Sequence, residues 1–361
     1  MKRVIENLER VAKNVYSSIM SLDKPELEMP IRSLSNVAYN LKDGYFKQQG
    51  RTKTRTLTAS TIKTFAQTLR MMSLSKQLVE TQDIATKRDA YYQSKGSWGD
   101  AGFKEQSESD SIMDDVEAMV RVNREQLGFI PDEDGSAVTG NVIIVDKDPV
   151  TGEKVEVDCS KFGTGGYNIP NSVEHFSFKT KAKFILAIET SGMYQRLVYH
   201  KFWKNQNCVL ISLKGVPSRA TRRFIRKLSD QHDLPVYVFT DGDPYGYLNI
   251  YRTLKVGSGN AAHINEFFCV PRAEYIGVTP SDIKKYNLPT HPLKDVDIKR
   301  LKDGLKNDPF VQHHKEWQKA LNDMVKSKVR VEQQAFSAHS LNYVLETYLP
   351  EKLKNKKSWL P

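Results

Sequence analysis

The stretch VYVFTDGDPYGY, residues 236–247, joins an apolar run, an acidic turn and the start of a helix. Its first four residues predict a buried strand. Its glycines permit a tight turn, and Pro244 suits the first position of a helix. The stretch therefore predicts a strand that ends at an acidic turn and passes directly into a helix.

The same alternation of apolar strand and amphipathic helix continues on both sides of this stretch. Helices are expected through Tyr199, over PSRATRRFIRKLSDQH (217–232) and from Pro244. The expected strands are KFILAIE (183–189), CVLISL (208–213), VYVFTD (236–241) and FFCVP (267–271). Strands separated by helices of this length favour a parallel sheet that is covered on both faces. The fold class of this half is therefore α/β.

Three carboxylates fall at the carboxyl ends of two of these strands. Glu189 and Asp241 end the first and the third strand, and Asp243 follows two residues after Asp241. In an open parallel sheet the functional groups gather at this edge, because the loops there converge around a crevice. Three carboxylates in such a place form a hard oxygen site of the kind that Mg²⁺ prefers.

Two other interpretations of the acidic turn compete with a magnesium site. An isolated Asp-x-Asp is usually a solvated turn, and only its placement at the strand end favours a metal. An EF-hand requires a glutamate at the twelfth loop position, whereas Arg252 stands there. The chain also contains no GxxxxGK[ST] motif, which argues against nucleotide hydrolysis by this chain itself.

The first 130 residues are expected to be mostly helical, with a loop over residues 94–111. From Gly140 the apolar period changes, and NVIIVD, the turn DPVTGE and KVEVDCS predict a hairpin. This hairpin is the expected join between domains, which we place at 1–139, 140–180 and 181–361. The chain after about residue 280 is expected to be helical and charged.

Composition indicates an intracellular globular protein with a polyanionic partner. Lys and Arg outnumber Asp and Glu by 54 to 43, which gives a net charge of +11. We expect no membrane span and no signal peptide. The three cysteines are widely spaced and are expected to be buried thiols, with Cys208 and Cys269 in strands, because no zinc or disulfide pattern is present.

One tyrosine stands beside a cation in TKRDAYYQ. Arg88 and Tyr92 are four residues apart near the end of an expected helix, so they share a face. A phenol with an ordinary pKa of about 10 needs a neighbouring cation before it can attack phosphorus at neutral pH. Arg88 could supply that charge, although an ordinary contact between helix neighbours would have the same spacing.

Eight segments, in this order, resemble the A subunit of archaeal DNA topoisomerase VI and, more distantly, the meiotic double-strand-break transesterase. Together they run across almost the whole chain. They are PIRSLSNVAY (30–39), TKRDAYYQS (86–94), WGDAGFKEQSESDSIMDDVEAMV (98–120), GTGGYNIPNSVE (163–174), AIETSGMYQRL (187–197), KGVPSRATRR (214–223), TDGDPYGY (240–247) and EYIGVTPSDIKKYNLP (274–289).

The resemblance implies a winged-helix domain of the CAP type that carries the nucleophile, followed by a Toprim domain. It assigns catalysis to Tyr92, the second tyrosine of the pair, together with Arg88 and Glu189. It assigns metal binding to Glu189, Asp241 and Asp243. Ala90 departs from the larger aliphatic residue that is usual in relatives.

The resemblance also implies a mechanism and a set of partners. Tyr92 would join the 5′ end of a DNA break, and Mg²⁺ would be held by the carboxylates of the other chain of a homodimer. Strand passage would need a separate GHKL ATPase, the B subunit, in an A₂B₂ assembly in the cytoplasm at the nucleoid. The N-terminal amphipathic helices are the candidate docking surface for it, or else they pack on their own domain.

The charged helix of residues 217–232 is a candidate DNA contact, through Arg219 and Arg222, because a basic run can follow phosphates. A charged run is also typical of a solvated helix face. Three other functions stay open: a Toprim nuclease in which Tyr92 is structural, a meiotic-type enzyme that breaks DNA without strand passage, and a non-catalytic DNA-binding scaffold.

Overall fold

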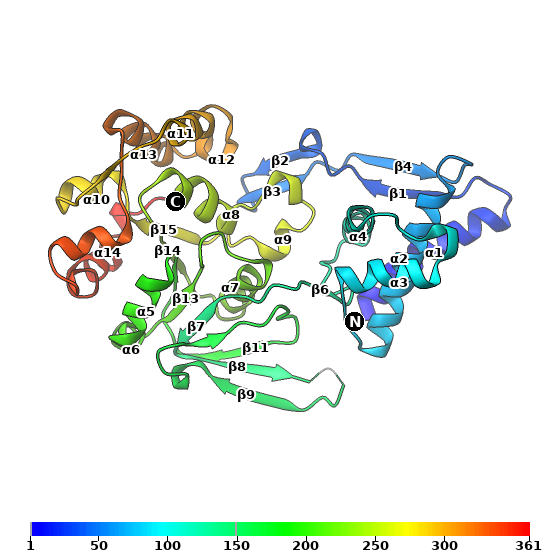
Figure 1. The fold of residues 1–361 in the computed structure, drawn as a ribbon, viewed down its shortest axis with the longest axis horizontal. Helices are drawn as coiled ribbons and strands as arrows, with labels where there is room; N and C mark the ends of the chain where they lie inside the picture. Colours follow the sequence, from blue (N-terminus) through cyan, green and yellow to red (C-terminus); the bar gives the residue numbers. More distant parts are fainter. Residues whose placement is uncertain (1, 149) are drawn as a thin grey trace.

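The computed structural model describes residues 2–148 and 150–361 and has two lobes (Figure 1). The helical lobe holds the first four long helices: α1 (Lys2–Met20), α2 (Ile62–Thr81), α3 (Lys87–Ser97) and α4 (Gln106–Val120). The sheet lobe holds a six-stranded sheet with its covering helices. None of the described helices combines the length and the apolar character needed to cross a membrane.

The main sheet confirms the predicted parallel arrangement. Its order is β10-β7-β13-β12-β14-β15, and the four strands from β13 to β15 run parallel. The strands are β7 (Ala137–Gly140), β10 (Tyr167–Asn168), β12 (Ile185–Ile188), β13 (Val209–Ser212), β14 (Val236–Phe239) and β15 (Ala273–Gly277). At one edge of the sheet, β7 pairs antiparallel with β13, and β10 pairs antiparallel with β7.

One expected strand is wrong. Within FFCVP, Phe268 ends the short helix α9 (Asn265–Phe268), and Cys269 is the residue that caps it. The fourth parallel strand is β15, which begins at Ala273. Cys208 likewise lies just before β13 instead of within it, although both cysteines are buried thiols as expected. A short apolar run fits a buried helix as well as a strand, which explains the error.

Successive residues of the central strands point to opposite faces of the sheet, and each face has its own core. Ile185 and Ala187 pack with α7 (Arg219–His232) and with the helices of residues 295–327. Leu186 and Ile188 pack with α5 (Ser191–Tyr199), with α6 (Phe202–Gln206) and with the last helical segments, residues 344–354. Because both faces are buried, the polar groups of the central strands are confined to the strand ends.

The helix expected from Pro244 is present. It begins at Pro244 and continues through a π-helical segment (Gly246–Tyr251) into α8 (Arg252–Lys255). The region after residue 280 is largely helical, as predicted, with a short pair of strands, β16 (His291–Pro292) and β17 (Val329–Arg330). Its helices are α10 (Pro280–Lys285), α11 (Asp295–Asn307), α12 (Pro309–His313), α13 (Lys315–Ser327), a π-helical segment (Val344–Tyr348) and α14 (Leu349–Lys354).

The predicted hairpin is also present. Strand β8 (Val142–Lys147) pairs antiparallel with β9 (Lys154–Asp158), and β11 (Ser177–Thr180) adds a third strand. Pro149, in the expected turn, lies outside the described residues.

The helical lobe contains more strand than the sequence predicted. Strand β1 (Glu26–Pro30) pairs with β4 (Thr52–Thr56), and β5 (Ala85–Thr86) pairs with β6 (Phe129–Ile130). The expected loop over residues 94–111 is also too long, because α3 continues to Ser97 and α4 begins at Gln106. Half-exposed strands such as TKTRT carry almost no apolar signal.

A second hairpin from the first fifty residues packs on the sheet lobe. It consists of β2 (Val37–Asn40) and β3 (Tyr45–Gln48), and Tyr45 and Phe46 belong to the core cluster of the sheet lobe. The Asn265 side chain donates a hydrogen bond to the Phe46 carbonyl at 2.9 Å, and the Phe46 N–H donates to the Val256 carbonyl at 3.2 Å. This hairpin therefore ties the two lobes together.

Candidate active site

Glu189, Asp241 and Asp243 lie together at the carboxyl edge of the sheet. Glu189 directly follows β12, and Thr240 alone separates β14 from Asp241. The Asp241 N–H donates to Glu189 Oε2 at 2.8 Å, so the ends of two adjacent strands are joined through the carboxylate itself. The structure therefore brings together the carboxylates that the sequence placed at this edge.

Each of the three carboxylates accepts one backbone hydrogen bond. Asp241 Oδ1 accepts from the Gln333 N–H at 2.7 Å, and Asp243 Oδ1 accepts from the Gly246 N–H at 2.6 Å. Within residues 2–148 and 150–361, the second oxygen of each carboxylate has no hydrogen-bond donor. One oxygen of each group is thus fixed, and the other is free to meet a cation.

Two glycines of TDGDPYG are required by close packing. A Cβ atom at Gly242 would lie 2.6 Å from Val331 Cγ1, and one at Gly246 would lie 2.5 Å from the Asp241 carbonyl oxygen. Neither position can hold a side chain without moving the loop. The tight turn that the sequence indicated is therefore needed to place Asp241 and Asp243 side by side.

The electrostatics of this edge favour the binding of a cation. Burial, and then the charge of Asp241, raise the pKa of Glu189 from 4.5 to about 8. Burial also raises the pKa of Asp241 to about 6, and that of Asp243 in the same direction. Arg330 faces both aspartates and lowers their pKa values, but it forms no ion pair with them within the described residues. Three crowded carboxylates without a paired cation suit a divalent metal.

A tighter acidic group occurs elsewhere and does not suit a metal. Ligand atoms of Asp114, Glu117 and His263 lie within 4.8 Å of one another, a spacing that the three carboxylates of the sheet edge do not reach in the described chain. Arg124 bonds to both Asp114 and Glu117, and Arg219 bonds to Glu117. Their charges are already compensated, so we assign no metal to this group.

Tyr92 and Arg88 lie on the exposed side of α3. The helix begins with a capping box in which Thr86 and Asp89 each accept a hydrogen bond from the other's backbone N–H. Ala90 is fully buried in the core of the helical lobe, and Tyr92 is 58% exposed. The neighbouring Tyr91 is held by a hydrogen bond to the Lys104 carbonyl at 3.1 Å. Of the two tyrosines, Tyr92 is the more exposed.

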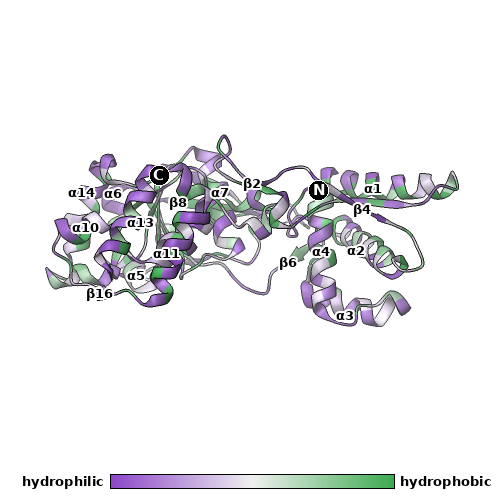
Figure 2. Cartoon of the chain, turned by 90° about the horizontal axis from the view of Figure 1, so that it is seen from above, coloured by the Kyte–Doolittle hydropathy of each residue, from purple (hydrophilic) through white to green (hydrophobic). Residues whose placement is uncertain are grey.

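The structure does not bring Tyr92 to the carboxylates of its own chain. Helix α3 belongs to the helical lobe, whereas the carboxylates lie at the ends of β12 and β14 in the sheet lobe (Figure 1). A view turned by 90° keeps the lobes apart and places α3 at the periphery of the helical lobe (Figure 2). Within one chain, the expected nucleophile and the expected metal ligands therefore lie in different lobes.

The positions of Arg219 and Arg222 argue against the expected DNA contact. Arg219 joins α7 to the helical lobe through Glu117 at 2.8 Å and Glu125 at 2.9 Å. Arg222 has a buried Nε without a partner in the described chain, and its guanidinium lies 5.6 Å from the centre of the Phe268 ring. A charged run suggests an exposed surface, but the acceptors of Arg219 lie 94 and 102 residues away and leave no local signal.

Gln333 was missed by the sequence reasoning. Its backbone N–H holds Asp241, and its buried side chain reaches the ends of β12 and β14. It lies 92 residues from Asp241 along the chain. A single glutamine carries no motif, so no local signal could have revealed it.

Comparison with known proteins identifies the family. A Methanocaldococcus jannaschii protein, named as the A subunit of type 2 DNA topoisomerase 6, is 56% identical over 356 residues, which cover 99% of this chain and 96% of that protein. Proteins of the same name from Methanothermobacter thermautotrophicus and Pyrococcus abyssi are each 37% identical, and cover 97% and 99% of this chain and 97% and 95% of their own length. The chain belongs to the family of DNA topoisomerase VI A subunits.

Sequence families that describe parts of the molecule agree with this membership. Residues 184–353 match the Toprim domain that the topoisomerase 6 A subunit shares with Spo11, residues 63–129 match type IIB DNA topoisomerase, and residues 132–182 match the all-beta domain of the DNA topoisomerase VI alpha subunit. The chain is thus the DNA-cleaving subunit of a type IIB topoisomerase, an isomerase. Its Toprim domain implies binding of a divalent metal.

The Arg219→Met variant should lose much stability. Burial raises the pKa of Glu117, but the Arg219 and Arg124 guanidinium groups outweigh burial and hold this pKa well below its usual range. Removing Arg219 leaves a buried charge without one of its partners, so we expect the free energy of unfolding to fall by roughly 3–5 kcal/mol in urea denaturation.

Arg272→Met is the matched control, because Arg272 pairs with the exposed Asp233. We expect it to cost at most about 1 kcal/mol. Unchanged stability in Arg219→Met, combined with weaker DNA binding, would instead support a DNA contact for Arg219.

The stability of the metal-free protein should fall as the pH rises from about 4.5 to about 8. In this window folded Glu189 keeps a proton that the unfolded chain releases, because its pKa rises from 4.5 to about 8 on folding. The folded state binds more protons, so its stability is lost with rising pH. Relative to Glu189→Gln, the loss should be on the order of 2 kcal/mol after discounting for solvent screening.

The measurement is chemical denaturation of both proteins in EDTA at several pH values. Addition of Mg²⁺ at pH 8 should restore stability to the native chain and not to Glu189→Gln. Parallel stability profiles of the two proteins without metal would contradict the assignment of a raised pKa to Glu189.

Proposed function

We propose that Tyr92 is the nucleophile that cleaves DNA and that Glu189, Asp241 and Asp243 hold the metal ion that assists it. The observation that supports this most is the division of the site: an exposed tyrosine and arginine on α3, and uncompensated carboxylates at the sheet edge. Helix α3 supplies a nucleophile and a cation but no metal ligands, and the sheet edge supplies metal ligands but no nucleophile.

The proposed reaction is a transesterification. The Tyr92 phenol gives up its proton to the solvent and its oxygen forms a bond to a backbone phosphorus, the bond from phosphorus to the 3′ oxygen breaks, and the leaving oxygen takes up a proton. Arg88, one helical turn from Tyr92, stabilises the phenolate and the charge on the phosphate. The new bond links Tyr92 to the 5′ end and conserves the energy of the phosphodiester, so resealing needs no nucleotide.

The carboxylates act on the leaving side of the phosphate. Their free oxygens would hold a divalent ion, for which we propose Mg²⁺ because all the donors are hard oxygens. When bound, this ion neutralises the phosphate charge and stabilises the leaving oxygen. We further assign to Glu189 the role of general acid and base.

The separation of Tyr92 from the carboxylates supports a homodimer. In two copies related by symmetry, Tyr92 of each chain can meet the carboxylates of its partner, which gives two composite sites on double-stranded DNA. Two such sites cut both strands and leave a short 5′ overhang. An A₂B₂ assembly with a GHKL ATPase would then supply the energy for strand passage, in the cytoplasm at the nucleoid.

We propose the domain division 1–139, 140–180 and 181–361, in which the first part acts as a winged-helix domain of the CAP type. Helix α3 is capped at Thr86 and packs on α4 through the core of the helical lobe. Tyr92 therefore stands on a rigid helix, which keeps a catalytic side chain in the geometry that its reaction requires.

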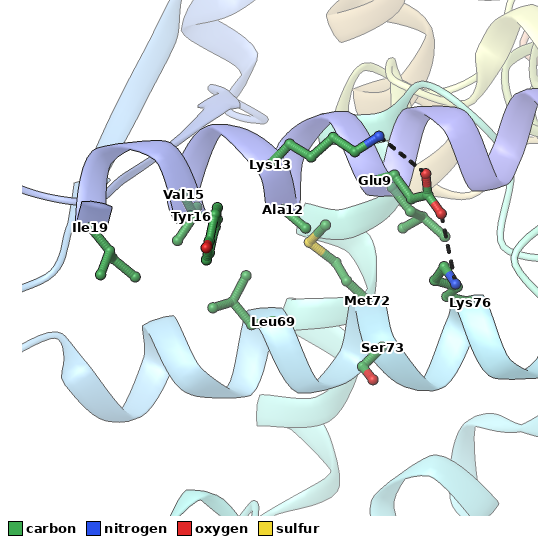
Figure 3. A pocket seen from close by; sticks show the side chains of 11 residues that line it. Glu9, Ala12, Lys13, Val15, Tyr16, Ile19, Leu69, Met72, Ser73 and Lys76 are labelled. Carbon is green, nitrogen blue, oxygen red and sulfur yellow. Dashed lines mark hydrogen bonds and ion pairs between the residues drawn. The ribbon is translucent and has the colours of Figure 1, made fainter. Parts of the chain in front are cut away.

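The docking surface proposed for the ATPase partner is a groove between α1 and α2. It has a volume of about 520 Å³ and apolar walls, and Lys13, Glu9 and Lys76 form a chain of ion pairs across its rim (Figure 3). Val4, Leu8 and Val15 are the buried residues of α1, and Leu8 and Val15 also line the groove beside Tyr16 and Ile19, which remain at least half exposed. The groove thus lies where the packed side of this helix passes into its exposed side.

Replacing Tyr92 with phenylalanine should abolish cleavage without affecting the fold. In the native enzyme, with its ATPase partner, detergent quenching should trap protein on the 5′ ends of DNA. Tyr92→Phe should give no covalent product, whereas Tyr91→Phe should retain cleavage. If Tyr92→Phe still cleaves and the native enzyme leaves free 5′ ends, the chain is a Toprim nuclease.

Mixed dimers test the composite site. A dimer of one Tyr92→Phe chain and one Glu189→Gln chain keeps a single intact site if each site combines two chains, so it should nick one strand. Sites formed within one chain would each carry a defect, and the mixed dimer would then be inactive.

Replacing Ile19 with glutamate should disrupt assembly with the ATPase partner. A charge in the apolar groove would be buried without a counter-charge, so we expect the affinity between the two proteins to fall by at least about tenfold, measured by sedimentation. Ile84→Glu, at an equally exposed isoleucine of the same lobe, is the control. Normal assembly of the Ile19→Glu chain would exclude this docking surface.

A further inference from the structure

A segment from the far end of the chain lies against the acidic turn. Val331 and Gly242 form an antiparallel bridge in which the Gly242 N–H donates to the Val331 carbonyl at 2.8 Å and the Val331 N–H donates back at 3.1 Å. The absence of a side chain at Gly242 allows this approach. The loop that carries Asp241 and Asp243 is therefore held from outside the parallel sheet.

Gln333 lies two residues after Val331 and is fully buried. Its side-chain oxygen accepts hydrogen bonds from the Thr190 hydroxyl at 2.8 Å and from the Thr190 N–H at 3.3 Å. Its side-chain nitrogen donates to the Phe239 carbonyl at 3.0 Å. One amide thus connects the residue that follows Glu189 with the last residue of β14.

The backbone of Gln333 adds the contact that matters most to the site. Its N–H donates to Asp241 Oδ1 at 2.7 Å, and the N–H of Asp241 in turn donates to Glu189 Oε2. A buried amide side chain is costly to place unless its hydrogen bonds are made, and here both ends are used. The side chain therefore fixes the position from which the backbone reaches Asp241.

Crowded carboxylates need such support, because like charges repel and move apart unless their positions are fixed. None of the contacts of Gln333 involves the free oxygens of the three carboxylates. Gln333 can therefore act on the metal site without touching a metal or DNA.

We propose that Gln333 is a positioning residue, which sets Asp241 against Glu189 in the geometry that binds a divalent cation. This inference rests on the proposal that Glu189, Asp241 and Asp243 hold that cation. Contacts of this kind, one step removed from the metal, orient the ligands themselves, and their loss typically weakens metal binding by about 10–100-fold.

The test is Mn²⁺ binding by the full chain, measured by the loss of the free-ion electron paramagnetic resonance signal, with the melting temperature recorded without metal. Gln333→Leu removes both ends of the amide contact and should weaken Mn²⁺ binding by at least about tenfold. The exposed neighbour Gln334 gives the matched control, and Gln334→Leu should bind Mn²⁺ like the native chain.

A second pair of variants approaches the same contact from the other side and guards against a folding defect in Gln333→Leu. Thr190→Val removes the hydroxyl that donates to Gln333, whereas Thr190→Ser retains it. We expect weaker Mn²⁺ binding in Thr190→Val and native binding in Thr190→Ser.

The outcomes separate the two proposals. If the native chain binds Mn²⁺ and Glu189→Gln binds it equally well, the proposed carboxylate site fails. If Glu189→Gln loses binding while Gln333→Leu and Thr190→Val melt earlier but bind Mn²⁺ with native affinity, Gln333 is merely structural and the positioning role is overturned.

Discussion

The parallel strands of the main sheet are buried on both faces, and this constraint decides where polar chemistry can occur. Side chains along the strands belong to one of two cores, so a carboxylate can be hydrated or bind a cation only where a strand ends. Strands β12 and β14 are neighbours in the sheet, so the groups that follow them are brought together. The approach of Glu189 and Asp241 is therefore a property of the strand order.

The same architecture separates the tyrosine from the carboxylates. The hairpin of β2 and β3 packs into the core of the sheet lobe, and Arg219 links α7 to buried acids of the helical lobe. These contacts hold the two lobes against each other and oppose a folding of α3 back onto its own sheet edge. In the homodimer that we propose, a second copy of the chain would complete the site without breaking either contact, which favours a composite site over closure of a single chain.

Sequence reasoning succeeded where the relevant signal was local or followed from the strand order. The approach of the three carboxylates at one sheet edge, the hairpin after Gly140 and the helix from Pro244 were all found in this way, whereas metal binding by the carboxylates stays a proposal. It gave no indication of distant partners: the ion pairs of Arg219 with Glu117 and Glu125 left no local signal, and neither did the contacts of Gln333. The expected strand at FFCVP failed for a different reason, since a short buried helix and a strand share the same apolar composition.

The three carboxylates share a structural arrangement that accounts for both their crowding and their availability. Each accepts one backbone N–H, from Asp241, Gln333 or Gly246, and a backbone donor cannot turn away as a side chain can. These hydrogen bonds lower the pKa values of Glu189 and Asp241, but burial raises them by more. The raised pKa values indicate that no nearby cation of the described chain fully compensates the carboxylates. A lysine or arginine paired with them would stabilise the metal-free fold but would occupy the oxygens that a cation needs. Holding the acids with backbone amides fixes their positions and leaves the second oxygen of each carboxylate open to the divalent cation that we propose for this site.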